Sequence, residues 1–288
     1  MLNIALLGTG RMGQSIASCI LRSGTQLTIW NRTPEKASEL VSRGALFAET
    51  PALAVKDADF VIAMLADDLA SEQVWLGHNG ALNNMREGAC LIECSTLSLP
   101  YVYALAEFAR QKKLRYIDCP VTGIPVAAEK GELTLLAGAA PDDLAVCKPV
   151  LQLFSKAIRH FGPVGKGTCY KLIINLMGAV QIAALAEGVA LADKLGLDGE
   201  VVTASIETSA AASPQVIRYV RAMMEKRYAD DPSFTIALRE KDARYALSLA
   251  ATAGFDARLG KVAKEWFSSA LQDFAEQDEA TVIEMMNN

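Results

Sequence analysis

A glycine-rich turn near the start of the chain constrains the fold more than any other feature. Gly8-Thr9-Gly10-Arg11-Met12-Gly13 follows the apolar run 2–7, which is typical of a buried parallel strand, and opens the helical pattern Arg11–Arg22. In that context Gly8 permits a tight turn, Gly10 lets the backbone approach a pyrophosphate, and Gly13 lets the helix pack on the strand. The helix N-terminus would offer N–H groups to the phosphates. The pattern predicts a dinucleotide site; the alternative is a plain connection with incidental glycines.

The segment after the second expected strand bears on which dinucleotide is bound. Residues 26–30 read as that strand, and Asn31-Arg32-Thr33 follows it. NAD-binding folds usually carry Asp or Glu here to bond the ribose 2′-hydroxyl, and a carboxylate would repel a 2′-phosphate. Asn31 is neutral, Arg32 can pair with a phosphate through two N–H bonds, and Thr33 adds a hydroxyl. The segment predicts NADP(H) in preference to NAD(H); the alternative is a turn and helix cap only.

The composition indicates a soluble globular protein. The 288 residues suffice for one large or two ordinary domains; 51% are hydrophobic and 21% are charged. The net charge of −5 gives no reason to expect a nucleic acid or an anionic membrane as partner. No apolar run reads as long enough to span a bilayer, and the chain enters a strand without a basic segment or cleavage site. We therefore expect a cytoplasmic protein.

The cysteines and histidines carry no metal-binding pattern. The six cysteines form no CxxC pair, and several lie in apolar patterns where cysteine acts as a small hydrophobic residue. Reduced thiols are expected. His78 and His160 join no cluster with metal-ligand spacing, so no metal site is predicted, although a histidine acid or base stays open.

The pattern of apolar runs divides the chain into two domains. Residues 1–163 alternate short strands with helical stretches such as Pro34–Arg43, as a doubly wound α/β sheet requires, and residues 164–288 are helical throughout. We predict an N-terminal Rossmann dinucleotide-binding domain and an all-α C-terminal domain, with one long interdomain helix. The expected strands are 2–7, 26–30, 60–65, 90–94, 114–118, 133–138 and 157–161, and the expected later helices are Lys166 to about Leu195, 199–209, 214–227, 234–253 and 258–274.

The ends of the third and fourth expected strands should line the ligand crevice. Ligands bind outside the carboxyl ends of strands in such sheets. Met64, Leu65 and Ala66 end the third strand, and Thr96 follows the fourth. These residues are candidates for cofactor contact.

The long helical segment from Lys166 to about Leu195 is apolar on most sides. A helix of this kind must be buried almost all round, and a domain of about 125 residues has a limited interior for it. We expect a homodimer or homotetramer that covers the helix; the alternative is burial wholly within its own chain.

Lys171 is the best candidate for a proton donor. It lies in this apolar segment, where a lysine is costly unless it is paired or used. Asn175 is four residues on, so both side chains project from one face of the helix. An ammonium can protonate a carbonyl oxygen as hydride arrives, and an amide beside it can orient the substrate. The alternative is a lysine that extends to the surface.

Five elements in order resemble the β-hydroxyacid dehydrogenases, the family of 3-hydroxyisobutyrate dehydrogenase and the glyoxylate/succinic semialdehyde reductases. The resemblance runs nearly end to end and is closest to the semialdehyde reductase branch. The matching elements are Gly8–Gly13 with Asn31-Arg32-Thr33, then Ser95-Thr96 before Pro100, Asp118-Cys119-Pro120-Val121-Thr122-Gly123, Gly165-Lys166-Gly167 with Lys171 and Asn175, and Phe234 with Leu238 and Lys241-Asp242.

The resemblance implies a role for each of these residues. It implies an NADP(H)-dependent oxidoreductase that interconverts a small hydroxyacid and its semialdehyde or keto acid, with a C-terminal domain like that of 6-phosphogluconate dehydrogenase. Lys171 is then the general acid and base, and Asn175 hydrogen-bonds the substrate. The residues implied to bind the substrate carboxylate are Thr122 and Gly123, and those implied to contact the cofactor include Arg11, Met12, Thr96 and Lys241.

The substrate loop departs from the family pattern. Thr122-Gly123-Ile124 stands where the family has Ser-Gly-Gly, so Thr122 adds a methyl group and Ile124 adds a β-branched side chain. We count Ile124 among the substrate-binding residues, and the departure leaves the substrate open. Two alternatives are an imine reductase, a related group that generally lacks the lysine, and an inactive NADP-binding scaffold or sensor.

Overall fold

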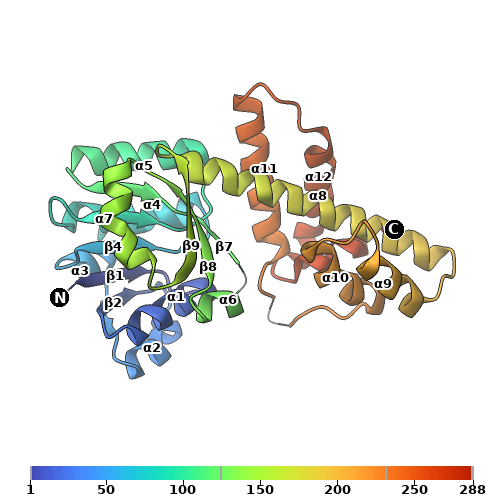
Figure 1. The fold of residues 1–288 in the computed structure, drawn as a ribbon, viewed down its shortest axis with the longest axis horizontal. Helices are drawn as coiled ribbons and strands as arrows, with labels where there is room; N and C mark the ends of the chain where they lie inside the picture. The colour runs from blue at the N-terminus through green and yellow to red at the C-terminus, as the bar shows by residue number, and fades with distance from the viewer. Residues whose placement is uncertain (1, 124, 231, 287–288) are drawn as a thin grey trace. The chain divides into compact units, whose positions relative to one another are not determined.

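The computed structural model describes residues 2–123, 125–230 and 232–286 (Figure 1). The chain forms two compact units, Met1–Lys171 and Leu172–Asn288, and each is described by itself. The division falls within a long helix, α8 (Lys166–Lys194). The domain boundary expected between residues 163 and 164 stays a prediction.

Unit 1 is built on a sheet whose first six strands are all parallel. The described strands join in the order β3-β2-β1-β4-β5-β6-β8-β7, with β9 paired to β8. β8 runs antiparallel to β6 and β7, and β9 runs parallel to β8. The strands are β1 (Asn3–Leu7), β2 (Gln26–Trp30), β3 (Leu46–Phe47), β4 (Phe60–Ala63), β5 (Cys90–Glu93), β6 (Arg115–Asp118), β7 (Val121–Thr122), β8 (Leu133–Gly138) and β9 (Ser155–Gly162).

Alternation along the central strands sends side chains into two separate cores. Ile4 and Leu6 pack with helix α1, whereas Ala5 and Leu7 pack on the opposite face. Helices therefore cover both faces, as the predicted doubly wound fold requires. The unit 1 helices are α1 (Arg11–Arg22), η1 (Pro34–Ala37), α2 (Ser38–Ser42), α3 (Pro51–Val55), α4 (Asp68–Leu76), η2 (Leu82–Asn84), α5 (Leu99–Gln111), α6 (Pro125–Glu129) and α7 (Pro141–Leu151).

Unit 2 is helical, as the sequence predicts. Its core gathers buried side chains such as Val189, Val220 and Phe267. Thr235 caps the helix α11 and forms an isolated bridge with Asp278, the one β-bridge in the described part of this unit. After α8 come α9 (Gly199–Thr208), α10 (Pro214–Glu225), α11 (Ile236–Thr252), α12 (Arg258–Phe274) and η3 (Glu279–Met286).

Several local expectations were wrong. The helix expected over Pro34–Arg43 is a 3₁₀ turn, η1, followed by the short helix α2. The strands β3 and β7 have two residues each, too few to produce a recognisable alternation in the sequence. The third expected strand ends at Ala63, two residues before its predicted end.

One expectation about the long helix was wrong, that no apolar run could span a bilayer, and so was the alternative that the helix is buried wholly within its own chain. α8 is long and apolar enough to cross a membrane by length and composition, although 44% of its most apolar window is buried within the protein. The same test is passed by core helices of soluble proteins. In the single chain Met177 and Leu191 are more than half exposed, so α8 is not buried all round.

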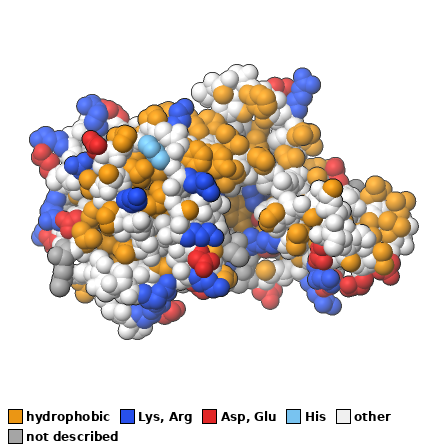
Figure 2. All heavy atoms as spheres, viewed as in Figure 1, with side chains coloured by type: hydrophobic (Ala, Val, Ile, Leu, Met, Phe, Trp, Pro, Cys, Tyr) orange, Lys and Arg blue, Asp and Glu red, His pale blue; other side chains and the backbone are white. Residues whose placement is uncertain are grey.

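Apolar side chains are also exposed along the connection between α8 and α9, as Figure 2 shows. The exposed residues there are Leu195, Leu197 and Val201. Contiguous exposed apolar surface is typical of an interaction face. A homo-oligomer stays a proposal on this ground.

Candidate cofactor and catalytic site

The glycine turn has the geometry that a dinucleotide cradle needs. Gly8 has φ +99°, and a Cβ there would lie 2.4 Å from the Met64 carbonyl oxygen. A Cβ on Gly13 would lie 2.0 Å from the Gly8 carbonyl oxygen, so only glycine lets α1 approach the turn. A Cβ on Gly10 would meet no described atom within 4 Å. The tight turn and the close packing of the helix are as expected, and the Gly10 side is open.

The N-terminus of α1 fits a phosphate group. Gly10 is its N-cap and has no side chain to occupy the first N–H groups, and the first turn contains no acidic residue. The first N–H groups of a helix and its dipole favour an anion. The residues present therefore fit the pyrophosphate of a dinucleotide, with Arg11 and Met12 at the start of the helix.

Asn31 holds the turn and its own loop together. Its Oδ1 accepts the Thr9 N–H at 2.9 Å, and its Nδ2 donates to the Thr33 carbonyl oxygen at 2.8 Å. An aspartate could accept the first bond, but its second oxygen would face the carbonyl. The local geometry thus favours an amide over a carboxylate at position 31.

Arg32 and Thr33 are both exposed beside this loop. Thr33 is the N-cap of η1, but its side chain makes no capping hydrogen bond with the described residues. The alternative role of Asn31-Arg32-Thr33, as a turn and helix cap only, therefore explains Asn31, whose side chain holds the turn. It does not explain the Thr33 hydroxyl, which makes no capping bond with the described residues.

The carboxyl ends of four neighbouring strands meet at one edge of the sheet. Leu7 pairs with Ala63, Ala63 with Glu93, and Glu93 with Asp118. The residues that follow these strands are Gly8, Met64, Cys94 and Cys119. The sequence-predicted cofactor residues Met64, Leu65, Ala66 and Thr96 all lie within three residues of this edge.

A buried carboxylate organises the loops at this edge. Glu93 is 1% exposed and accepts hydrogen bonds from Trp75 Nε1 at 2.9 Å, Ser71 Oγ at 3.1 Å and the Ser95 N–H at 3.0 Å. Ser95 Oγ in turn accepts the Leu65 N–H at 2.8 Å. Burial raises the pKa of Glu93, and its three donors oppose that shift. Glu93 thus ties α4 and the two loops that carry predicted cofactor contacts.

A second buried carboxylate fixes the start of α8. Asp118 accepts the Gly165 N–H at 2.6 Å, the Thr168 N–H at 2.8 Å and the Thr168 hydroxyl at 3.0 Å. Gly167 lets α8 start this close to the sheet, because a Cβ at this position would lie only 2.0 Å from the Leu136 carbonyl oxygen. The half-buried Lys171 lies one turn further along α8 from Thr168. Asp118 therefore links the predicted proton donor to the carboxyl edge of the sheet.

The predicted substrate loop begins on a short strand. Thr122 pairs with Thr134 of β8 and is half-buried. Gly123 has φ +136°, and a Cβ there would lie 2.8 Å from Leu133 Cδ2, so glycine is required. Ile124 lies outside the described residues.

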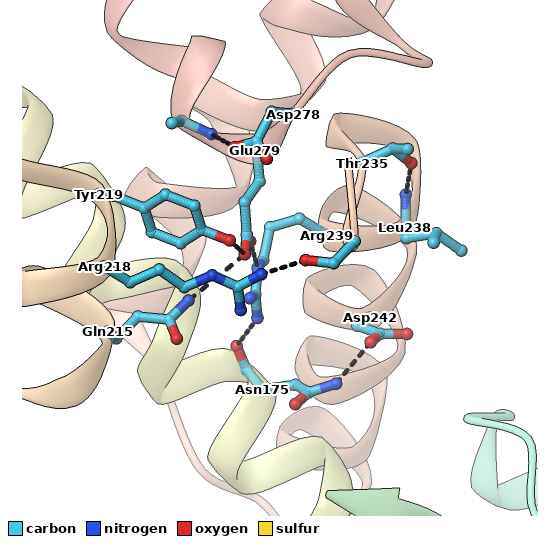
Figure 3. Close-up of polar contacts among 12 residues, drawn as sticks. Asn175, Gln215, Arg218, Tyr219, Thr235, Leu238, Arg239, Asp242, Asp278 and Glu279 are labelled. Carbon is cyan, nitrogen blue, oxygen red and sulfur yellow. Dashed lines mark hydrogen bonds and ion pairs between the residues drawn. The ribbon is translucent and has the colours of Figure 1, made fainter. Parts of the chain in front are cut away.

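In unit 2 the predicted residues Asn175 and Lys241 share one carboxylate, that of Asp242, and Figure 3 shows its bond to Asn175. Asn175 Nδ2 donates to Asp242 Oδ2 at 2.5 Å, and Lys241 Nζ lies 3.0 Å from Asp242 Oδ1. Asp242 is 1% exposed. The structure therefore brings Asn175 of α8 together with the Lys241-Asp242 pair of α11.

The prediction missed Glu93, and it named Asp118 and Asp242 only as parts of motifs. A glutamate within the apolar run 90–94 was a usable signal, because an acidic residue is seldom fully buried without hydrogen-bond partners. Among the described residues no group of three or more His, Cys, Asp or Glu side chains is placed to hold a metal ion.

Two family models together match almost the whole chain. The model of the NAD-binding domain of 6-phosphogluconate dehydrogenase matches residues 3–162. The model described as NAD-binding of NADP-dependent 3-hydroxyisobutyrate dehydrogenase matches residues 165–286.

Individual proteins are similar over nearly their full lengths. Glyoxylate/succinic semialdehyde reductase 1 of Arabidopsis thaliana is 31% identical over 93% of this chain and 92% of its own length. The uncharacterized oxidoreductase YfjR of Bacillus subtilis (strain 168) is 33% identical over 98% and 99%. The structure of Mycobacterium tuberculosis 3-hydroxyisobutyrate dehydrogenase with L-serine covers all of both chains, with a TM-score of 0.88 and 27% identity.

Proposed function

The chain belongs to the β-hydroxyacid dehydrogenase family, and we propose that it is an NADP(H)-dependent reductase of a small semialdehyde or keto acid. The coarser part follows from the family: the protein is an NAD(P)-dependent oxidoreductase of the hydroxyacid dehydrogenase type. The cofactor preference, the catalytic role of Lys171 and the substrate are the proposal. The reverse reaction, oxidation of the hydroxyacid, uses the same groups.

One observation carries the proposal. The glycine turn, the Leu65 and Ser95 loops, and the start of α8 with Asp118 all belong to the carboxyl edge of the parallel strands. Ligands bind outside this edge in open α/β sheets. A cofactor held by the turn would therefore lie at the edge from which the Lys171 helix starts.

The preference for NADP(H) rests on residues 31–33. The neutral Asn31 is held by Thr9 and Thr33, and the exposed Arg32 offers a fork of N–H donors that suits a phosphate. A carboxylate at position 31 would repel both the Thr33 carbonyl and a 2′-phosphate. NADP(H) also fits reduction as the working direction.

The chain's own residues transfer a proton and position the substrate. When bound, the reduced nicotinamide supplies the hydride. Lys171 holds a proton at Nζ and delivers it to the substrate carbonyl oxygen, and it takes the proton back in the oxidative direction. Asn175 orients the substrate by a hydrogen bond, and Thr122 and Gly123 bind a carboxylate through hydroxyl and backbone N–H groups. We include Ile124, a residue that the sequence predicts to bind substrate, in the same proposal.

The test is to assay a panel of substrates for turnover, measured as the decrease in NADPH absorbance. The panel contains glyoxylate, succinic semialdehyde, short keto acids, matched aldehydes without a carboxylate, and cyclic imines. We expect turnover of a carboxylate-bearing carbonyl and at least about tenfold lower kcat/KM for its uncharged match, about 1.4 kcal/mol. Turnover of imines alone would replace the proposal with C=N reduction, and NADPH binding without any turnover would favour a scaffold or sensor.

A further inference from the structure

A buried ion pair in unit 2 lies outside the residues that the proposed reaction uses. Arg239 of α11 and Glu279 of η3 have side chains only 6% and 1% exposed, and Arg239 Nε lies 2.5 Å from Glu279 Oε2. Taking two charges out of water is costly, so a buried pair needs further hydrogen bonds to be stable. Both Arg239 and Glu279 make such bonds, and one bond of Arg239 goes to Asn175, a predicted substrate-binding residue.

Arg239 makes its second contact with the backbone of α8. Its Nη1 donates to the Asn175 carbonyl oxygen at 2.9 Å, as Figure 3 shows. A Cβ on Gly178 would lie 3.1 Å from the same nitrogen, so the glycine leaves room for the guanidinium against the helix. The guanidinium carbon also lies 4.6 Å from the centre of the Phe234 ring. The guanidinium is thus held at a defined place beside Asn175.

Glu279 is itself anchored from two other segments. Its Oε1 accepts the Tyr219 hydroxyl at 2.6 Å and Gln215 Nε2 at 3.4 Å, both from α10. Its backbone N–H donates to the Phe234 carbonyl oxygen at 3.1 Å. Burial and the neighbouring Glu279 raise the pKa of Tyr219, so this hydroxyl stays a donor. The carboxylate can therefore fix Arg239.

We propose that Arg239, held by Glu279, is a positioning residue that sets Asn175 for substrate binding. Arg239 fixes the Asn175 carbonyl while Asp242, three residues along the same helix, fixes the Asn175 side-chain amide at 2.5 Å. One helix thus holds both ends of one residue, which leaves the amide a single orientation. The inference rests on the proposed function of Asn175.

The decisive variant removes both charges together. Arg239→Met alone leaves Glu279 buried and unpaired and can fail to fold, because breaking a buried pair on one side is strongly destabilising. Arg239→Met/Glu279→Gln removes the pair, keeps an acceptor for Tyr219, and lacks the donor to Asn175. Arg221→Met is the matched control, since the ion pairs that Arg221 of α10 makes with the described residues, Glu200 and Glu225, lie near the surface.

The first readout is independent of activity. The side-chain amide of Asn175 is followed by NMR in protein labelled with ¹⁵N-asparagine and assigned with Asn175→Ala. We expect the resonance to shift or broaden in the double variant and to stay unchanged in Arg221→Met. An unchanged Asn175 resonance in the folded double variant would overturn the inference, whether or not the protein turns over any substrate.

The second readout links the position of Asn175 to the reaction. With the substrate found in the panel, the double variant should lose at least about tenfold in kcat/KM while the Kd for NADPH stays within about twofold. In an Asn175→Ala background the same double substitution should lower kcat/KM less than about twofold, because the substitutions at 239 and 279 act through the Asn175 side chain. An equal loss in both backgrounds would mean that Arg239 does not act through Asn175. Failure of the proposed function would show separately, as a wild-type protein with no substrate.

Discussion

Asp118 provides the sharpest test of how the fold places the proton donor. Its two carboxylate oxygens accept three hydrogen bonds, at 2.6 Å from Gly165 just before α8 and at 2.8 and 3.0 Å from Thr168 in its first turn, and the residue is fully buried. Three substitutions remove these bonds in steps: Thr168→Val, Asp118→Asn and Asp118→Ala. If the carboxylate holds the helix, stability and turnover should fall in that order.

The expected free energies follow from the groups left behind. Thr168→Val removes one hydroxyl–carboxylate bond, worth about 1.5–3 kcal/mol. Asp118→Asn keeps one acceptor oxygen but turns an NH₂ group toward one backbone N–H. Asp118→Ala leaves the Gly165 and Thr168 N–H groups without an acceptor, at about 1–3 kcal/mol each, so the loss should reach about 2–6 kcal/mol.

The assay separates unit 1 from unit 2. Trp30 and Trp75 lie in unit 1 and Trp266 in unit 2, so in a Trp266→Phe background tryptophan fluorescence reports unit 1 alone. Urea unfolding followed in this way gives the stability change, and kcat is measured well below the unfolding midpoint. A shift of about 1 Å at a catalytic group can cost about a hundredfold in rate, so Asp118→Asn should lower kcat by at least about tenfold. Asp118→Ala within about 0.5 kcal/mol of wild type, with wild-type kcat, would refute the reasoning.

Two further predictions concern the cofactor edge. Asn31→Asp should raise the Kd for NADPH at least about tenfold and change the Kd for NADH less, because a carboxylate repels the 2′-phosphate; equal changes in titrations of both cofactors would contradict this. Burial raises the pKa of Glu93, so its contribution to stability is present below the ordinary glutamate pKa and is lost as pH rises through the folded value. As pH rises above the ordinary glutamate pKa, urea midpoints should therefore fall more steeply in wild type than in Glu93→Gln, and parallel curves would exclude this contribution of Glu93 to the pH dependence.

Much of the fold could be predicted from local patterns. The apolar run before Gly8 and the helical spacing after Gly13 specify a strand, a turn and a helix within about 20 residues, where sequence spacing is informative. Pro34 predicts a helix start but cannot show that the first turn is 3₁₀. Two-residue strands such as β3 form because a neighbouring strand is present, so they leave no periodic signal.

The supporting residues of the site could not be predicted because their contacts are long-range. Asp118 bonds residues about 50 positions away, and Arg239 bonds Asn175 across 64 positions. Their spacing in the sequence has no regular pattern, and only the fold brings the partners together. A charged residue in an apolar run, as at Glu93, shows that partners must exist but not which they are.

The most direct test of the account is single-turnover reduction by Lys171→Met. Enzyme with bound NADPH is mixed with the carbonyl substrate from the panel, and NADPH absorbance is followed in wild type and variant. The account predicts a rate lower by about 10²–10⁴-fold with the Kd for NADPH unchanged, because the variant keeps the glycine turn and loses the proton donor. A rate equal to that of wild type would remove Lys171 from the mechanism.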